Sequence, residues 1–272
     1  MTTLSLFLDI AGRVTKESQI DSYFTVASVI IPTADVKKVR TRLGDNLPKW
    51  RNATSESLSL VADCVSEYSV ASTVVKIEKK QPAWGKFCEK ASEYHGYLTK
   101  TLNEKVGFAK PGNVLKCRIL GLGAATGLGL HIKYHGRPEL FDQDGLNMLR
   151  LEITCDSDIQ GTENRETFKT FWEKWAKSPR LPHDLLIRAY IDRVEFKTEE
   201  DEPVLQLPDY LAGHIQFSNN PKKVTFSEHL LINNIRSFEK ELKRIKTYKV
   251  INRPFNEIYP NLVKKDYQGL CS

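Results

Sequence analysis

The sequence predicts a single α/β domain in which helices flank a mixed β-sheet. Apolar runs with the length of strands are intermixed with segments whose apolar residues recur at helical spacing, and no internal repeat or low-complexity linker separates them. With 272 residues, of which 40% are hydrophobic, the chain is long enough to bury one large core. We therefore expect one domain over residues 1–272, with room for an insertion at about residues 105–148 and a C-terminal helical extension from about residue 225.

The N-terminal third predicts a β-hairpin followed by helices. An apolar run at residues 4–9 and a β-rich run at residues 23–31 are joined by a short polar connection, which favours antiparallel neighbours. Asp9 therefore stands at the C-terminal end of a strand. Apolar periodicity then predicts, in chain order, helices at residues 36–50 and 58–68, a strand at 70–77 and a helix at 84–102.

The remaining chain predicts further strands and helices around a glycine-rich segment. We expect a flexible turn at residues 121–129, because two β-like runs flank the glycines. Asp156 follows an alternating strand, and Pro208 is tolerated only in a first helical turn, which puts Asp209 near a helix N-terminus. In chain order we expect strands at residues 114–120, 130–134 and 149–155, a helix at 168–175, a strand at 185–196, a helix at 204–217 and a capped helix from 225, followed by about 23 irregular residues.

The composition excludes several classes of protein. The longest weakly apolar stretch, residues 119–130, contains four glycines and is shorter than the roughly 20 residues of a membrane span, so none is expected. The N-terminus lacks the basic region of a signal peptide, and five widely spaced cysteines without a Cys-x-x-Cys pair indicate core residues, so we expect a cytoplasmic protein. The net charge of +6 weakly favours polyanionic partners, although the basic cluster at residues 240–249 is typical of a solvated helix face.

Three acids form the main hypothesis for a functional site. Asp9 and Asp156 end strands, and Asp209 lies in the first turn of a helix, where loops converge at one edge of an α/β sheet. Clustered carboxylates bind hard divalent ions, and two Mg²⁺ or Mn²⁺ ions can activate water and stabilise the leaving oxygen in phosphodiester hydrolysis. Taken singly, each acid has an ordinary explanation as a turn former or as a charge at a helix N-terminus.

Two segments of the chain, one near the N-terminus and one around Asp209, resemble the domain of unknown function 3800 family. Leu-Asp-Ile-Ala-Gly at residues 8–12 resembles the family's opening Asp-Glu-Ser-Gly strand, and Leu-Gln-Leu-Pro-Asp-Tyr-Leu-Ala-Gly at residues 205–213 resembles its closing Leu-Gln-Leu-Ala-Asp-x-x-Ala-Gly helix. The resemblance implies a ribonuclease-H-like fold, with Asp9 and Asp209 at the positions of family acids. Asp156 matches a mid-chain acid of the family, with Asp158 as its nearest competitor.

The sequence departs from the family pattern at two positions. Ile10 stands where the family usually has glutamate, and Pro208 replaces alanine. Two hypotheses of function follow from the resemblance. One is a nuclease that depends on Mg²⁺ or Mn²⁺ and acts on nucleic acid. The other, motivated by Ile10, is a catalytically inactive binding or regulatory protein with a protein partner, such as a component of a bacterial phage-defence system.

Other polar residues are weaker candidates. Glu195 alternates with apolar residues on the last expected strand and is a reserve metal ligand, although a solvated strand face is the commoner explanation. The spacing of His131 and His135 would suit zinc on a helix, but their segment has the pattern of a strand. The glycine-rich segment resembles a phosphate loop without its Gly-x-Gly-x-x-Gly spacing, and a nucleotide-binding enzyme that uses this segment is the third hypothesis.

Overall fold

The computed structural model describes residues 2–12, 23–45, 47–78, 111–135, 149–156, 190–218 and 228–254. Within these ranges six strands form one sheet in the order β5-β4-β1-β2-β3-β6. The strands are β1 (Thr2–Ala11), β2 (Tyr23–Pro32), β3 (Ala71–Glu78), β4 (Leu149–Asp156), β5 (Tyr190–Lys197) and β6 (Tyr248–Pro254). The helices are α1 (Val36–Leu43), α2 (Ser55–Tyr68), α4 (Pro111–His135), α6 (Gln206–Ser218) and α7 (Glu228–Arg244), with short 3₁₀ turns η1 (Thr33–Asp35), η2 (Trp50–Asn52) and η4 (Pro203–Leu205).

The strand directions confirm the predicted mixed sheet. β2 is antiparallel to β1 and to β3, as the short connection after β1 requires, whereas β1 with β4, β4 with β5 and β3 with β6 are parallel pairs. The first five strands therefore lie in the order β3-β2-β1-β4-β5, with β2 alone reversed. This order gives the ribonuclease-H-like α/β sheet expected from the sequence.

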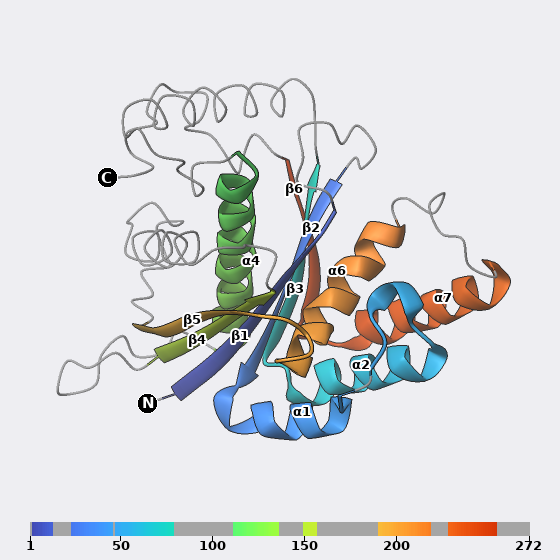
Figure 1. The fold of residues 1–272 in the computed structure, drawn as a ribbon, viewed down its shortest axis with the longest axis horizontal. Helices are drawn as coiled ribbons and strands as arrows, with labels where there is room; N and C mark the ends of the chain where they lie inside the picture. The colour runs from blue at the N-terminus through green and yellow to red at the C-terminus, as the bar shows by residue number, and fades with distance from the viewer. Residues whose placement is uncertain are drawn as a thin grey trace.

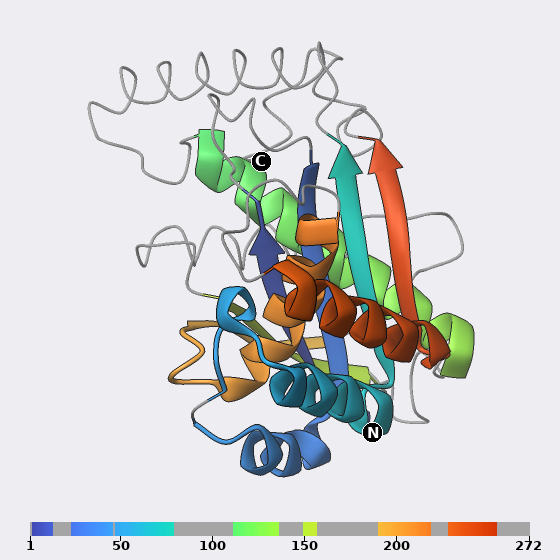
Figure 2. The same ribbon diagram turned by 90° about the vertical axis from the view of Figure 1, so that its right-hand side faces the viewer.

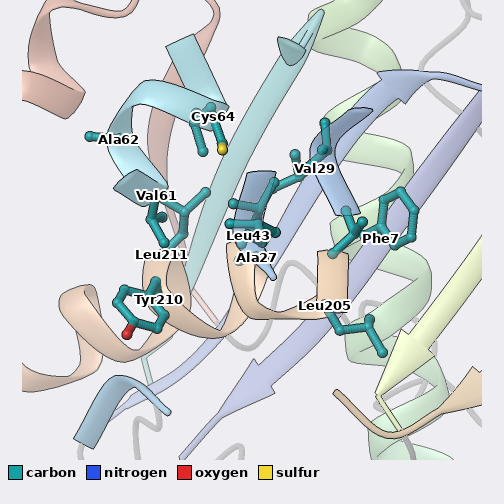
Figure 3. Packing of buried hydrophobic residues seen from close by; sticks show 14 of the residues in the cluster. Phe7, Ala27, Val29, Leu43, Val61, Ala62, Cys64, Leu205, Tyr210 and Leu211 are labelled. Atoms are coloured by element: carbon teal, nitrogen blue, oxygen red, sulfur yellow. The ribbon is translucent and has the colours of Figure 1, made fainter. Parts of the chain in front are cut away.

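Helices cover both faces of the sheet, as Figures 1 and 2 show. On one side, the α4 face, Leu6 and Leu8 of β1 pack in a core with α4. On the other side, the α6 face, Phe7 of β1 packs in a second core with residues of α1, α2, α6 and α7. Figure 3 shows this second core, where Tyr210 and Leu211 of α6 lie near side chains of α2. Alternate residues of each strand thus point to opposite faces.

The predicted strands at residues 114–120 and 130–134 are wrong, because both segments lie within the single helix α4. Two glycines show why a helix forms there. A Cβ atom at Gly123 would lie 2.6 Å from Val26 Cγ2, and one at Gly127 would lie 2.5 Å from Ser28 Oγ. The glycines therefore let α4 lie directly against β2, where larger side chains would hold it away. The expected flexible turn at residues 121–129, and with it a phosphate loop, is not formed.

The predicted helix at residues 36–50 is too long. Helix α1 ends at Leu43, because Gly44 takes a left-handed conformation with φ of 67°, at which the chain leaves the helix. Trp50 is therefore not on the apolar face of α1 but in the separate turn η2. Residues 47–50 become available for contacts with α6 that the helical spacing did not predict.

The expectation that the last 23 or so residues are irregular is also wrong in part, since β6 pairs in parallel with β3 at the edge of the sheet. Helix α7 ends at Arg244, so Lys249 belongs to β6 and not to a helical cluster at residues 240–249. Of the region 105–148, residues 111–135 form α4 and pack into the core. The expected helices at residues 84–102 and 168–175 lie outside the described residues.

In the part of the chain that the structure describes, no helix is both long enough and apolar enough to cross a membrane. Cys64 and Cys155 are buried and are not part of a disulfide bond. They fill the α6-face and α4-face cores respectively, as the sequence predicted.

Candidate functional site

Asp9 and Asp156 lie side by side at the carboxyl ends of two parallel strands. The register of β1 and β4 pairs Leu8 with Cys155, so the next positions along the strands are Asp9 and Asp156. Leu8 and Cys155 belong to the α4-face core, and therefore both acids point to the α6 face. Adjacent strands are about 4.8 Å apart, so the two carboxylates stand at neighbouring positions.

Helix α6 places the third acid over the same face. Thr25 Oγ1 of β2 donates to the carbonyl oxygen of Ala212 at 3.2 Å, which fixes the middle of α6 against the hairpin. Thr25 lies two positions before Ala27, the β2 partner of Asp9. Asp209 precedes Ala212 by less than one turn of α6. The first turn of α6 is therefore held near the strand ends that carry Asp9 and Asp156.

Residues 47–50, which we call the strap, run across the first turn of α6 and are tied to it by hydrogen bonds. The strap connects the end of α1 to η2, and its backbone supplies both acceptors and a donor. The bonds are Gln206 Nε2 to the Leu47 oxygen at 2.9 Å, Tyr210 Oη to the Pro48 oxygen at 2.6 Å, and Trp50 N–H to Asp209 Oδ2 at 3.0 Å. The polar residues of the 205–213 motif thus tie the strap to the first turn of α6.

The carboxylate of Asp209 has an unusual electrostatic environment. Burial raises its pKa to about 6, and the nearby carboxylates of Glu199 and Asp156 act in the same direction. The N–H of Trp50 and the ammonium of Lys49 oppose this rise. The charge of Asp156 thus acts on the carboxylate of Asp209, although less than burial does.

Two residues of this environment were not anticipated from the sequence. Glu199 follows β5 in the turn that leads to η4, and its side chain is only 10% exposed. Its carboxylate forms an ion pair with Lys49 Nζ at 2.7 Å. Glu199 could have been selected from the sequence, because an acid in a short connection from a strand to a helix lies at the carboxyl edge of the sheet. Lys49 carried no comparable signal, since it depends on how the strap crosses α6.

The remaining candidates are less well placed. Glu195 shares the α6 face with Asp156 but is paired with Lys197 at 2.9 Å, and the hydrogen bond from Lys197, the largest cause, lowers its pKa. Asp158 lies outside the described residues. Ile10 is buried in the α4-face core, so a glutamate at that position would point away from Asp9. The departure from the family pattern at Ile10 therefore removes no acid from the α6 face.

These donors fit a hard divalent ion in kind. Carboxylate oxygens are the ligands that Mg²⁺ and Mn²⁺ prefer, and a cation would relieve the repulsion that helps to raise the pKa of Asp209. Among the described residues, no group of three or more His, Cys, Asp or Glu side chains is close enough to share one ion as it stands. Electrostatic repulsion acts over longer distances than coordination at about 2.1 Å, so three of these carboxylates would have to rotate toward one another to share one ion.

A different pair of possible ligands is formed by the histidines of α4. Because the segment is helical and not a strand, His131 and His135 stack with ring centroids 4.7 Å apart. His135 Nε2 makes a 3.0 Å hydrogen bond with the Val70 carbonyl oxygen, in keeping with a role in packing α4 against the start of β3. Within the described ranges no third ligand joins this pair, so it does not form a zinc site there.

The raised pKa of Asp209 gives a prediction for stability without metal. The folded protein keeps a proton on Asp209 up to about pH 6, whereas the unfolded chain releases it near 3.8. Ionisation therefore destabilises the folded state progressively between about pH 4 and pH 6, and this loss persists at higher pH. Asp209→Asn does not titrate and retains an oxygen that can accept the Trp50 N–H, so we expect it to be about 1–3 kcal/mol more stable than the wild type at neutral pH.

Urea unfolding in EDTA at several pH values between 4 and 8 measures this difference. Asp35→Asn is the matched control, because Asp35 is paired with Lys38 on the surface at 2.7 Å and belongs to a different part of the fold. A gap between Asp209→Asn and the wild type that stays constant, or that shrinks as pH rises, would contradict the assignment.

Comparisons with known proteins gave matches only among solved structures. No protein-family model and no curated protein sequence matches the chain. It is similar to ribonuclease H2 from Pyrococcus horikoshii OT3, with a TM-score of 0.44 and 11% identity over 96% of this chain and 100% of that chain. It is also similar to Bst-RNase HIII in complex with Mn²⁺, with a TM-score of 0.39 and 11% identity over 80% of this chain. In the second case the chain spans about half of the matched protein, 53% of its length.

Proposed function

We propose that this protein is a metal-dependent nuclease that hydrolyses phosphodiester bonds at a site formed by Asp9, Asp156 and Asp209. The observation that carries the proposal is the placement of these acids. Two stand at neighbouring carboxyl ends of parallel strands, and the third comes from the first turn of the helix that covers the same face. The charges of Asp156 and Glu199 both act on Asp209, which a purely structural role for Asp209 would not require.

Each residue of the site has a role in this proposal. Asp9, Asp156 and Asp209 would hold Mg²⁺ or Mn²⁺, which when bound lowers the pKa of a coordinated water and stabilises charge on the leaving oxygen. The N–H of Trp50 fixes Asp209 Oδ2, so that Oδ1 is oriented as a ligand. Lys197, the β5 register partner of Asp156, is placed to contact a phosphate of the substrate.

Nucleic acid is the partner class that fits this face. The charge of Lys49 acts on Asp156 and Asp209, and phosphate contacts from Lys and Arg position a backbone without reading its sequence. Arg193 and Lys197 project from β5 on the same side as Glu195, to which both are paired. We therefore expect binding that weakens steeply as salt concentration rises.

The test is a cleavage screen with end-labelled single-stranded and double-stranded DNA, single-stranded RNA and an RNA–DNA hybrid. Each is incubated with wild-type protein in Mg²⁺, in Mn²⁺ or in EDTA. We expect cleavage of at least one substrate in a divalent metal and none in EDTA. Salt-dependent binding without cleavage in any metal would overturn the nuclease and favour the inactive binding or regulatory protein, for which a protein partner should then be sought.

A further inference from the structure

The strap carries a lysine whose backbone is tied to α6 while its side chain is mostly exposed. Hydrogen bonds on both sides of Lys49 tie the strap to the first turn of α6. The side chain of Lys49 is nevertheless 60% exposed, and four flexible bonds separate its ammonium from the backbone. The ammonium can therefore move without disturbing the hydrogen bond that holds Asp209.

The ammonium of Lys49 contacts one carboxylate and interacts electrostatically with two others. It is 2.7 Å from Glu199, whose side chain is almost fully enclosed. It also interacts electrostatically with Asp156 and Asp209, and all three acids favour its charged form. The charge of Lys49 thus already acts on two of the three acids that the proposed function assigns to a divalent ion, Asp156 and Asp209.

We propose that Lys49 is a tethered counter-ion of the carboxylate site, which leaves Glu199 when a divalent ion binds. The inference rests on the proposed function, because it concerns the same site. Two cations cannot both stay close to Glu199 without strong repulsion, and the mobile one is displaced. Glu199, freed from the ion pair, becomes available as a fourth carboxylate for the ion.

The first experiment measures Mn²⁺ binding by titration calorimetry without nucleic acid. Lys49→Met keeps the length and apolar stem of the side chain and removes its charge, so we expect Mn²⁺ to bind about tenfold more tightly than to the wild type. Lys38→Met is the matched control, because Lys38 is also an exposed lysine paired with one acid at 2.7 Å, and it should bind as the wild type does. Equal or weaker binding by Lys49→Met would overturn the inference while leaving the proposed function standing.

Two further variants test the competition itself. Lys49→Arg keeps the positive charge and should not gain affinity for Mn²⁺. Glu199→Gln in the Lys49→Met background should remove most of the gain, because the released carboxylate is no longer present. A gain that persists in the double variant would overturn the role of Glu199.

The outcome for metal binding separates the two proposals. If neither the wild type nor Lys49→Met binds Mn²⁺, both proposals fail together. If the wild type binds Mn²⁺ and the Lys49→Met, Lys49→Arg and Lys38→Met variants all match it, only the counter-ion is wrong. Thermal unfolding in EDTA adds a readout that needs no metal, since Lys49→Met should unfold at a lower temperature than Lys38→Met when the carboxylates lose their cation.

Discussion

Replacing Asp9 by Asn is expected to lower kcat/KM for metal-dependent cleavage at least about 100-fold while leaving the fold intact. Asn has almost the same shape, and its side-chain oxygen can still accept the Ile10 N–H that Asp9 Oδ1 accepts at 2.7 Å. What is lost is the negative charge that a divalent ion requires. The measurement is cleavage of the best substrate from the screen, with urea unfolding of the same preparation.

Asp156→Asn should behave in the same way, because Asp156 occupies the neighbouring position on β4. Asp35→Asn, which alters a surface ion pair in η1, should cleave at the wild-type rate. Wild-type cleavage by both site variants would remove the proposed site. A loss of more than about 2 kcal/mol of stability in Asp9→Asn would instead show that this buried acid, 6% exposed, is structural.

Gly213→Ala is expected to lower the stability of the protein by about 3 kcal/mol, the upper part of the range for overpacking a core. A Cβ atom at Gly213 would overlap the indole ring of Trp50. That ring has little room to move, since it packs edge-on against Tyr210 with centroids 5.7 Å apart and against His214 with centroids 5.9 Å apart. Because the N–H of Trp50 also orients Asp209, metal binding should weaken together with stability.

Thermal unfolding tests this prediction, with an expected fall in Tm of roughly 6–12 °C for a chain of this size. The double variant Gly213→Ala/Trp50→Leu provides the matched comparison, since a smaller side chain at position 50 makes room for the new methyl group. It should be less damaged than the sum of the two single changes predicts. A Gly213→Ala protein as stable as the wild type would show that Trp50 can repack without cost.

The packing of Trp50 and the strap gives four residues of the 205–213 segment a structural role. Gln206 and Tyr210 bind the strap, Asp209 accepts the N–H of Trp50, and Gly213 leaves room for its ring. These roles need particular side chains at fixed helical positions, so they leave a compact pattern in the sequence. The strap itself leaves no such pattern, because it contributes mainly backbone atoms and the flexible side chain of Lys49.

The sequence by itself determined the elements whose cause is local. An apolar run and a β-rich run specified the hairpin of β1 and β2, and alternating apolar residues specified the strand β4. The position of Pro208 specified that Asp209 lies in the first turn of α6. Local patterns placed Asp9, Asp156 and Asp209 at the ends of elements, and the family resemblance gave the further reason to group them as candidates. Parallel pairing of β1 and β4 then puts two of these acids at one edge of the sheet.

Only the tertiary structure decided the features that depend on distant parts of the chain. The segment around Gly123 and Gly127 is a helix because β2 offers a surface that it can approach closely, and β6 is a strand because β3 offers it an edge. Glu199 and Lys49 are 150 positions apart in the chain and meet because the strap crosses α6. Local spacing carries no information about such meetings, since the free energy that favours them comes from packing and pairing between remote segments.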